Sequence, residues 1–240
     1  MIRIFAKEFN SFLNSLIAYL VIGVFLTGIG LLLWVFPETS VLDYGFADMD
    51  TLFSMAPFVF IFLIPAITMK SFAEENKMGT MELLLTKPLS DWDIVLGKFA
   101  AAFALTLFAL LPSLIYYFSI SKLGNPVGNI DTAGVIGSYI GLSLLVLVFC
   151  SIGILASSLT VNQIVSFILA AFLCFIFYTG FDSLASLSGS FALTIKQFGI
   201  LYHYEALSKG LIDSRDVIYF LSVAGLMLLG AKTVIGSRQW

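Results

Sequence analysis

The side chains that could take part in polar chemistry are concentrated in residues 70–98, which read KSFAEENKMGTMELLLTKPLSDWDIVLGK. The 240-residue chain has 12 Lys and Arg and 15 Asp and Glu, and nine of these 27 charged residues lie in this segment. Carboxylates and amines at this density can form charge-assisted hydrogen bonds with another protein. The sequence around the segment is almost entirely apolar. We therefore expect residues 70–98 to be the part of the chain that contacts a partner in the cytoplasm.

Motifs for nucleotide binding or hydrolysis are absent from the sequence. It contains no Gly-x-x-x-x-Gly-Lys-Ser/Thr, no Gly-x-Ser-x-Gly and no His-Glu-x-x-His. The one histidine, His203, has no second histidine or cysteine nearby, which favours a structural or interfacial role over a metal site. Cys150 and Cys174 lie in apolar stretches and are interpreted as packing thiols. We expect a non-catalytic chain with no metal or cofactor of its own.

The composition is that of a membrane protein. The mean hydropathy is +1.03, and 60% of residues are hydrophobic while only 11% are charged. Soluble domains have about 25% charged residues. A soluble fold of this length could not bury so much apolar surface, so the bilayer must act as the solvent. The net charge of −3 gives no argument for a nucleic-acid partner.

The length of the apolar stretches predicts an all-α polytopic membrane protein with six spans in a single domain, residues 1–240. A helix that crosses the hydrocarbon needs about 20 apolar residues. The long run from 132 to 181 has no charged side chain, and we divide it at its most polar part, residues 157–163. The predicted spans are residues 16–36, 51–69, 99–121, 134–156, 164–181 and 217–235.

The distribution of basic residues predicts that both termini face the cytoplasm. Eight of the 12 Lys and Arg fall in segments 1–15, 70–98, 157–163 and 232–240, whereas residues 37–50 carry four acids and no base. Cytoplasmic loops are enriched in Lys and Arg.

Residues 2–16 form a predicted amphipathic helix ahead of the first span. It can lie in the membrane plane with Arg3 and Lys7 on its polar face. Ile4 does not fit the pattern. The alternative is a simple extension of the first span. The apolar residues that share one face are Ile2, Phe5, Phe9, Phe12, Leu13 and Leu16.

Within the charged segment, residues 80–87 are predicted to form a short cytoplasmic helix between two breakers, Gly79 and Pro88. Thr80 can serve as N-cap, and Glu82 lies in the first turn, where the helix dipole favours an anion. Residues 90–93, Ser-Asp-Trp-Asp, then predict a capping box that opens the third span. Three consecutive leucines, 83–85, cannot all face the membrane, so part of this surface should contact another protein. The alternative is a solvated loop.

The sequence from residue 74 to residue 98 closely resembles the loop between spans two and three of ABC-2-type transporter permeases. Members of that family show an acidic pair, a Gly-Thr-x-Glu-x-Leu-Leu core, a Pro-Leu-Ser and an Ile-x-x-Gly-Lys. Residues 157–167 and 207–223 resemble the branch associated with bacterial gliding motility. The matching residues of the loop are Glu74, Glu75, Gly79, Thr80, Glu82, Leu84, Leu85, Pro88, Leu89, Ser90, Ile94, Gly97 and Lys98.

The resemblance implies a connecting helix at the N-terminus, a coupling helix within residues 70–98, and re-entrant or interfacial helices within residues 182–216. It also implies a separate cytoplasmic ATPase that binds ATP and Mg, a second permease half, and an accessory membrane protein with an extracytoplasmic domain. The residues it assigns to the ATPase contact are Glu74, Glu75, Gly79, Thr80, Glu82, Leu83, Leu84 and Pro88, with Arg3 and Lys7 on the connecting helix.

We therefore predict a permease subunit of an ABC exporter in the bacterial inner membrane, paired with a second copy or a related permease and serving export or gliding. The alternative is a membrane scaffold of a motility or secretion machine that transports nothing. An ATPase-independent carrier or channel is disfavoured, because the spans contain almost no ionisable groups to act as relays.

Overall fold

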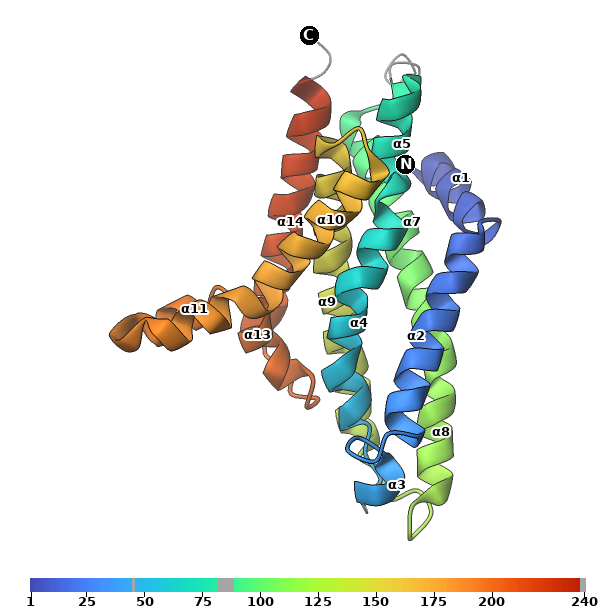
Figure 1. The fold of residues 1–240 in the computed structure, drawn as a ribbon, viewed down its shortest axis with the longest axis vertical. Coiled ribbons are helices and arrows are strands. Elements are labelled where there is room, and N and C mark those ends of the chain that lie inside the picture. The colour runs from blue at the N-terminus through green and yellow to red at the C-terminus, as the bar shows by residue number, and fades with distance from the viewer. Residues whose placement is uncertain (45, 82–88, 238–240) are drawn as a thin grey trace.

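The computed structural model describes residues 1–44, 46–81 and 89–237, and this part of the chain is helical with no strand. Figure 1 shows a long bundle with α1, the end of α5 and the C-terminal end of the last helix, α14, at one end. Short 3₁₀ or π segments, Leu111–Ser113, Ile176–Gly180 and Gly189–Phe191, connect some helices. The helices are α1 (Ile2–Leu13), α2 (Leu16–Trp34), α3 (Val41–Tyr44), α4 (Asp50–Thr68), α5 (Lys70–Met78), α7 (Asp91–Leu110), α8 (Leu114–Leu123), α9 (Thr132–Leu159), α10 (Gln163–Phe175), α11 (Phe181–Leu187), α12 (Ala192–Lys196), α13 (Ile200–Leu207) and α14 (Ser214–Gly236).

Five helical runs among the described residues are long and apolar enough to cross a membrane, which makes the chain a multi-pass membrane protein. A sixth span is formed if α1 and α2, which are bent by 65° relative to each other, count as one. The all-helical prediction is confirmed, with five to six candidate spans. The five runs are Asp50–Met78, Asp91–Leu123, Thr132–Leu159, Gln163–Leu187 and Ser214–Gly236.

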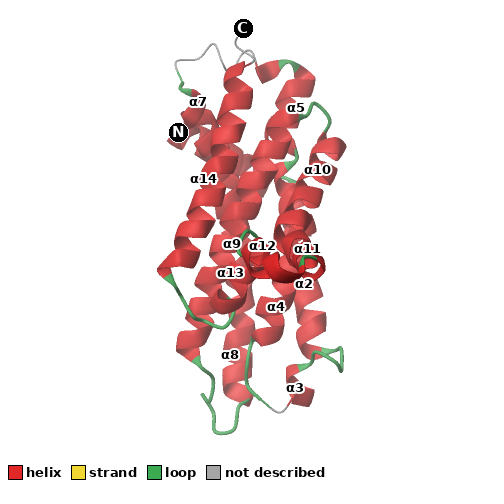
Figure 2. Ribbon diagram, turned by 90° about the vertical axis from the view of Figure 1, so that its left-hand side faces the viewer, coloured by secondary structure: helices red, strands yellow, loops and turns green. Residues whose placement is uncertain are grey.

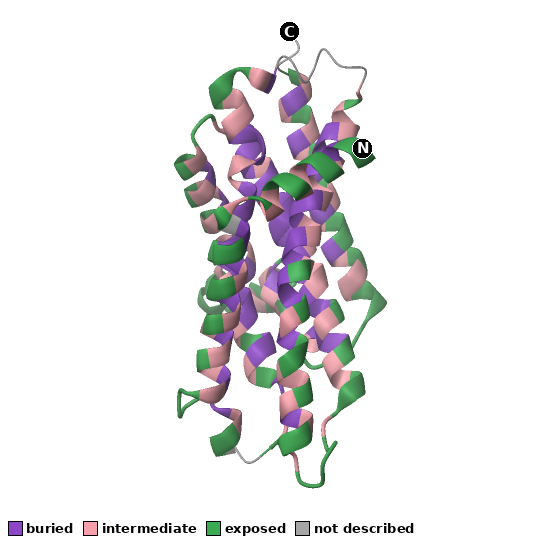
Figure 3. Ribbon diagram, turned by 90° about the vertical axis from the view of Figure 1, so that its right-hand side faces the viewer, coloured by how far each residue is buried: buried purple, intermediate pink, exposed green. Residues whose placement is uncertain are grey.

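Helix α9 is the central element of the bundle, since α4, α7, α10 and α14 all pack against it. Its glycines allow this close packing, because a helix without a Cβ at the contact can approach its neighbour. A Cβ placed on Gly141 would lie 2.5 Å from the Leu207 Cβ, and one on Gly153 would collide with Thr68. Figure 3 shows the buried residues along the middle of the bundle and exposed ones on its outer faces.

The long charge-free run is divided at residues 160–162, between α9 and α10. This break lies within the predicted segment 157–163. Asn162 caps α10 by accepting a hydrogen bond from Ile164 N at 2.9 Å, and Asp131 caps α9 through Gly134 N at 3.0 Å. The Asn162 cap lies at the break itself and begins the second of the two helices that this apolar stretch forms.

The connection between α10 and α14 leaves the bundle. Figures 1 and 2 show α11 directed away from the bundle axis, and the chain returns through α12 and α13. Apolar side chains on this excursion are exposed, including Leu187 (85%), Phe191 (70%) and Leu193 (71%). Re-entrant helices between the last two spans stay a prediction.

Helix α1 departs from the sequence pattern in its first turn, whereas Phe9, Phe12 and Leu13 of the predicted apolar face pack against the core. Ile4, which the pattern set aside, is the one buried residue of α1, whereas Ile2 of the predicted apolar face is 76% exposed. The reason is the contact with α7, where Gly97 has no side chain and leaves room for Ile4. A Cβ on Gly97 would lie 2.9 Å from the Ile4 Cβ. In this first turn the contact with α7 therefore decides which side chain is buried.

Candidate functional site

Among the residues assigned to partner contact from the sequence, those that the structure describes lie at the end of the bundle that holds α1. Glu74 and Glu75 are on α5, and Gly79 and Thr80 follow it. Arg3 and Lys7 are on α1. Four predicted residues, Glu82, Leu83, Leu84 and Pro88, lie outside the described residues, together with most of the predicted coupling helix.

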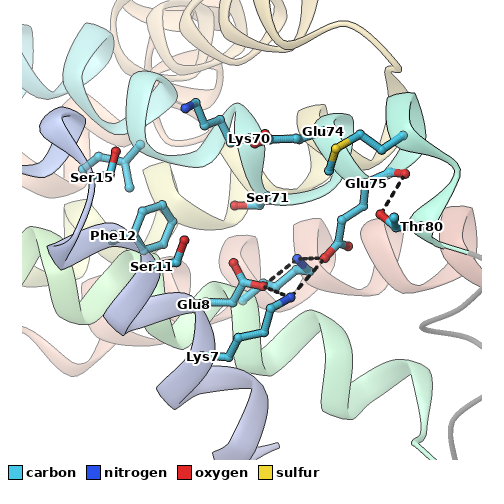
Figure 4. A pocket seen from close by; sticks show the side chains of 13 residues that line it. Lys7, Glu8, Ser11, Phe12, Ser15, Lys70, Ser71, Glu74, Glu75 and Thr80 are labelled. Carbon is cyan, nitrogen blue, oxygen red and sulfur yellow. Dashed lines mark hydrogen bonds and ion pairs between the residues drawn. The ribbon is translucent and has the colours of Figure 1, made fainter.

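A group of four ionised side chains joins α1, α5 and α7, and we call Lys7, Glu8, Glu75 and Lys98 the charged junction. Lys98 Nζ lies 2.9 Å from Glu75 Oε1 and 3.1 Å from Glu8 Oε1. Lys7 Nζ is more distant, 3.5 Å from Glu8 Oε1 and 3.8 Å from Glu75 Oε1. Figure 4 shows Lys7 and Glu8 of α1 facing Glu75 of α5. Two positive and two negative charges balance within the junction.

Burial makes Lys98 the central residue of the charged junction. Its side chain is 2% exposed, against 14% for Glu8 and 13% for Glu75, while Lys7 on the rim is 65% exposed. The Phe72 ring centroid lies 5.1 Å from Lys98 Nζ, a cation–π contact. An ammonium out of water is costly unless it is paired and hydrogen-bonded. Helices α1, α5 and α7 are therefore held in the arrangement that brings the carboxylates of Glu8 and Glu75 to Lys98.

The start of α7 is fixed by the capping box that the sequence predicts, which is confirmed. Asp93 N donates to Ser90 Oγ at 3.2 Å, and Ser90 N donates to Asp93 Oδ2 at 3.3 Å. Lys98 follows one to two turns later, on the face of α7 that packs against α1.

The end of α5 is fixed by Gly79, which the sequence analysis treats only as a breaker before residues 80–87. Gly79 has φ 68°, a left-handed conformation that terminates a helix and that glycine adopts without strain. The Thr80 hydroxyl lies 3.4 Å from the carbonyl oxygen of Glu75 and donates to it. Thr80 thus serves the end of α5, whereas its predicted role as N-cap of the next helix concerns residues outside the described part.

Helix α5 is also attached to the C-terminal end of α9 through Ser157. Its Oγ accepts from Phe72 N at 2.9 Å and Ala73 N at 3.1 Å, and donates to Met69 O at 3.1 Å. Asn76 Nδ2 adds a bond to Thr160 O at 3.0 Å. Helices α4 and α5 meet at Met69, where backbone groups at the helix ends need partners outside the helix. The Ser157 hydroxyl supplies these partners.

Sequence reasoning missed Glu8, Ser71 and Ser157, and treated Lys98 only as part of a motif at a span entrance. The available signal for Lys98 was its charge in an apolar helix, which usually marks a functional position. Nothing in the spacing indicates Glu8, since its partner is 90 residues away. Arg3 is exposed and takes no part in the described ion pairs.

His203 has the structural role expected of it. Its Nδ1 lies 2.7 Å from Asp216 Oδ1, and its Nε2 lies 2.9 Å from Gln197 O. The ring stacks on Tyr219 with centroids 3.9 Å apart, so the side chain joins α13 to α14. Both cysteines are buried, as expected of packing thiols.

Comparison with known proteins identifies one family. The model of the ABC-2 family transporter proteins matches residues 3–235, nearly the whole chain. A search of curated proteins gave no match.

Proposed function

This chain belongs to the ABC-2 transporter family and is a membrane permease of an ABC transporter, and we propose that it serves an exporter driven by a separate ATPase subunit. ABC-2 permeases in general work with a partner ATPase. In the proposed assembly that subunit binds ATP and Mg, and this chain is non-catalytic.

The observation that carries the proposal is the charged junction. The segment between α5 and α7 is the proposed contact with the ATPase. The helices on its two sides are joined by the Lys98–Glu75 ion pair, and α1 joins them through Glu8. A displacement of the segment would therefore move α5, α7 and α1 together. Since α5 continues α4 and α7 crosses the membrane, the motion reaches two spans.

Other features of the proposal rest on the sequence. Eight of the 12 Lys and Arg lie in the two terminal segments and in the segments predicted on the same side of the membrane. This excess supports a cytoplasmic location, in a bacterial cell, for both the N- and the C-terminus. The resemblance of residues 157–167 and 207–223 supports the gliding-motility branch and, with it, an accessory membrane protein. A twofold pair with a second permease copy is the default for such assemblies.

The test is coexpression of this chain with its ATPase, followed by copurification and an ATPase assay. Leu84→Asp and Glu82→Lys place a charge in the proposed contact, where truncating an anchor typically costs about 2 kcal/mol or more. We expect both variants to release the ATPase or to abolish transport while the chain stays folded in the membrane. Asp48→Asn, on the predicted outer loop, is the control. Full binding and activity in both variants would contradict the proposal.

A second measurement separates an exporter from a scaffold that transports nothing. The ATPase rate of the purified complex is measured in the presence and absence of candidate cargo. An exporter is expected to respond to its cargo, because cargo binding and ATP hydrolysis are coupled through the permease. A rate that no cargo changes, together with normal motility or secretion in cells, would favour the scaffold.

A further inference from the structure

A pocket of about 500 Å³ lies beside the charged junction, between α1 and α5. Figure 4 shows its side chains, with Lys7, Glu8 and Ser11 on one wall and Lys70, Ser71 and Glu74 on the other. The pocket is lined by three bases and three acids, Lys7, Lys70, Lys98, Glu8, Glu74 and Glu75. A site with both signs in equal number fits a ligand that itself carries one positive and one negative group.

Two buried polar atoms of this pocket point to such a ligand. Ser71 is 4% exposed, and its Oγ has no hydrogen-bond partner among the described residues. The same holds for Glu75 Oε2, since only Oε1 of that carboxylate contacts Lys98 and Lys7. Buried polar atoms are almost always hydrogen-bonded, and each unsatisfied one in a native protein requires an explanation. The hydroxyl can donate or accept, whereas the carboxylate oxygen requires a donor.

An apolar groove of about 500 Å³ begins within one helical turn of the pocket, on the α4 side of Lys70. It is lined by Leu20 and Val24 of α2, Phe62 and Ala66 of α4, and Phe167 of α10. Phe62 is 63% exposed and Val24 59% exposed. Met69 lines the groove, and the next residue, Lys70, lines the polar pocket. The groove and the pocket therefore follow each other along one seam between α1–α2 and α4–α5.

The order of side chains along this seam matches the order of parts in a phospholipid. From the middle of the bilayer toward the bundle end, α4 and α5 present apolar residues up to Ala66, then Lys70 and Ser71, then Glu74 and Glu75. With a rise of about 1.5 Å per residue, the base and the acids are roughly 6 Å apart along the helix. None of the described ion pairs involves Lys70 or Glu74.

We propose that this seam binds a zwitterionic phospholipid with a primary-amine headgroup, of the phosphatidylethanolamine class. One acyl chain lies in the groove, the phosphate contacts Lys70 and the Ser71 hydroxyl, and the ammonium donates to Glu74 and to Oε2 of Glu75. A trimethylated amine has no N–H to donate to that oxygen. A lipid with a net negative headgroup would bring no cation to Glu74, the one acid of the pocket that takes no part in the described ion pairs. The N–H donors of the headgroup therefore decide the selectivity.

The test is native mass spectrometry of the purified full chain, incubated with equal amounts of dioleoyl phosphatidylethanolamine, phosphatidylcholine and phosphatidylglycerol. We expect the parent chain to retain the ethanolamine lipid in preference to the other two. The variants Lys70→Ala and Glu74→Gln should each retain about tenfold less of it, a loss that corresponds to one charged hydrogen bond. Lys122→Ala and Glu38→Gln, exposed charges at the other end of the bundle, are matched controls and should retain it fully. Ala66→Trp, which fills the groove, should also reduce retention.

Soluble phosphoethanolamine distinguishes the lipid from its headgroup alone. Phosphoethanolamine at the same concentration as the lipid should not displace the lipid, because phosphoethanolamine lacks the acyl chain that occupies the groove. Equal retention of the three lipids, unchanged retention on Lys70→Ala and Glu74→Gln, or full displacement by phosphoethanolamine would each overturn the proposal. The measurement requires no ATPase, so its result is independent of whether the permease is coupled to one.

Discussion

At the scale of single residues, Lys98 combines features that rarely occur together. It lies in a helix that crosses the membrane, its side chain is 2% exposed, and two carboxylates contact its Nζ at 2.9 Å and 3.1 Å. A buried ion pair of this kind adds little stability compared with apolar side chains of the same volume. Its value lies in the geometry, since a wrong relative placement of α1, α5 and α7 would leave a charge unpaired.

Removing one partner of the charged junction should therefore destabilise the fold. Lys98→Met leaves Glu8 and Glu75 with only the exposed Lys7, at 3.5 Å and 3.8 Å, as a cation, and breaking a buried pair costs about 3–5 kcal/mol. We expect a clearly lower midpoint of thermal unfolding in detergent. Combining Lys98→Met with Glu8→Gln and Glu75→Gln removes the unpaired charges and should recover much of the loss. Lys77→Met, at an exposed lysine of α5, is the control. If the single variant unfolds at the same temperature as this control, Lys98 does not join the helices.

The sequence indicated part of this junction and missed the rest for a physical reason. Glu75 belongs to an acidic pair in a charged segment, so composition alone selects it. Glu8 contacts Lys98 across 90 residues of sequence, and only the packing of α1 on α7 brings them together. Glu74, chosen with Glu75, has no part in the described ion pairs and lines the neighbouring pocket instead. Local spacing cannot separate the roles of two adjacent carboxylates.

At the scale of elements, local sequence indicated helix ends and part of the packed face of α1, where Phe9, Phe12 and Leu13 contact the core. The capping box at Ser90 and the left-handed Gly79 depend on residues within one turn, so the sequence contains all the required information. The burial of Ile4, which does not fit the pattern of α1, depends on Gly97, far away in the sequence. The predicted helix of residues 80–87 lies largely outside the described residues and stays a prediction.

The packing of α9 makes a further prediction at this scale. In Gly153→Ala the new methyl group would collide with the Thr68 side chain, which itself donates to Ile64 O at 2.9 Å. Overpacking of this kind typically costs about 1–3 kcal/mol. We expect a lower unfolding midpoint than for the parent chain. Gly225→Ala in α14, where no atom lies within 4 Å of the added Cβ, is the matched control.

That control should be neutral or slightly stabilising, because alanine favours a helix over glycine by about 1 kcal/mol. The same intrinsic gain applies at position 153, so the difference between the two variants isolates the packing term. Equal unfolding midpoints would show that α4 and α9 can separate at Thr68 without cost.

At the scale of the whole molecule, the arrangement of the helices agrees with the distribution of charge. Helix α1, the end of α5 and the end of α14 lie at one end of the bundle, and the connection between α8 and α9 lies at the other (Figure 1). The first end collects the basic segments of the sequence and the charged junction. Whichever membrane face it occupies, residues 77 and 125 must lie on opposite sides, because α7 and α8 form one continuous apolar run between them.

Cysteine labelling tests which end of the bundle faces the cytoplasm. Lys77 and Asn125 are exposed, so a cysteine at either position is accessible to a membrane-impermeant maleimide from its own side. Cys150 and Cys174, both buried, are first replaced by alanine. In intact cells we expect Asn125→Cys and Tyr44→Cys to be modified and Lys77→Cys to be protected until the membrane is opened. This outcome follows from the preference of Lys and Arg for the cytoplasmic side. Modification of Lys77→Cys in intact cells would invert the orientation and place the charged junction outside, where no ATPase could reach it.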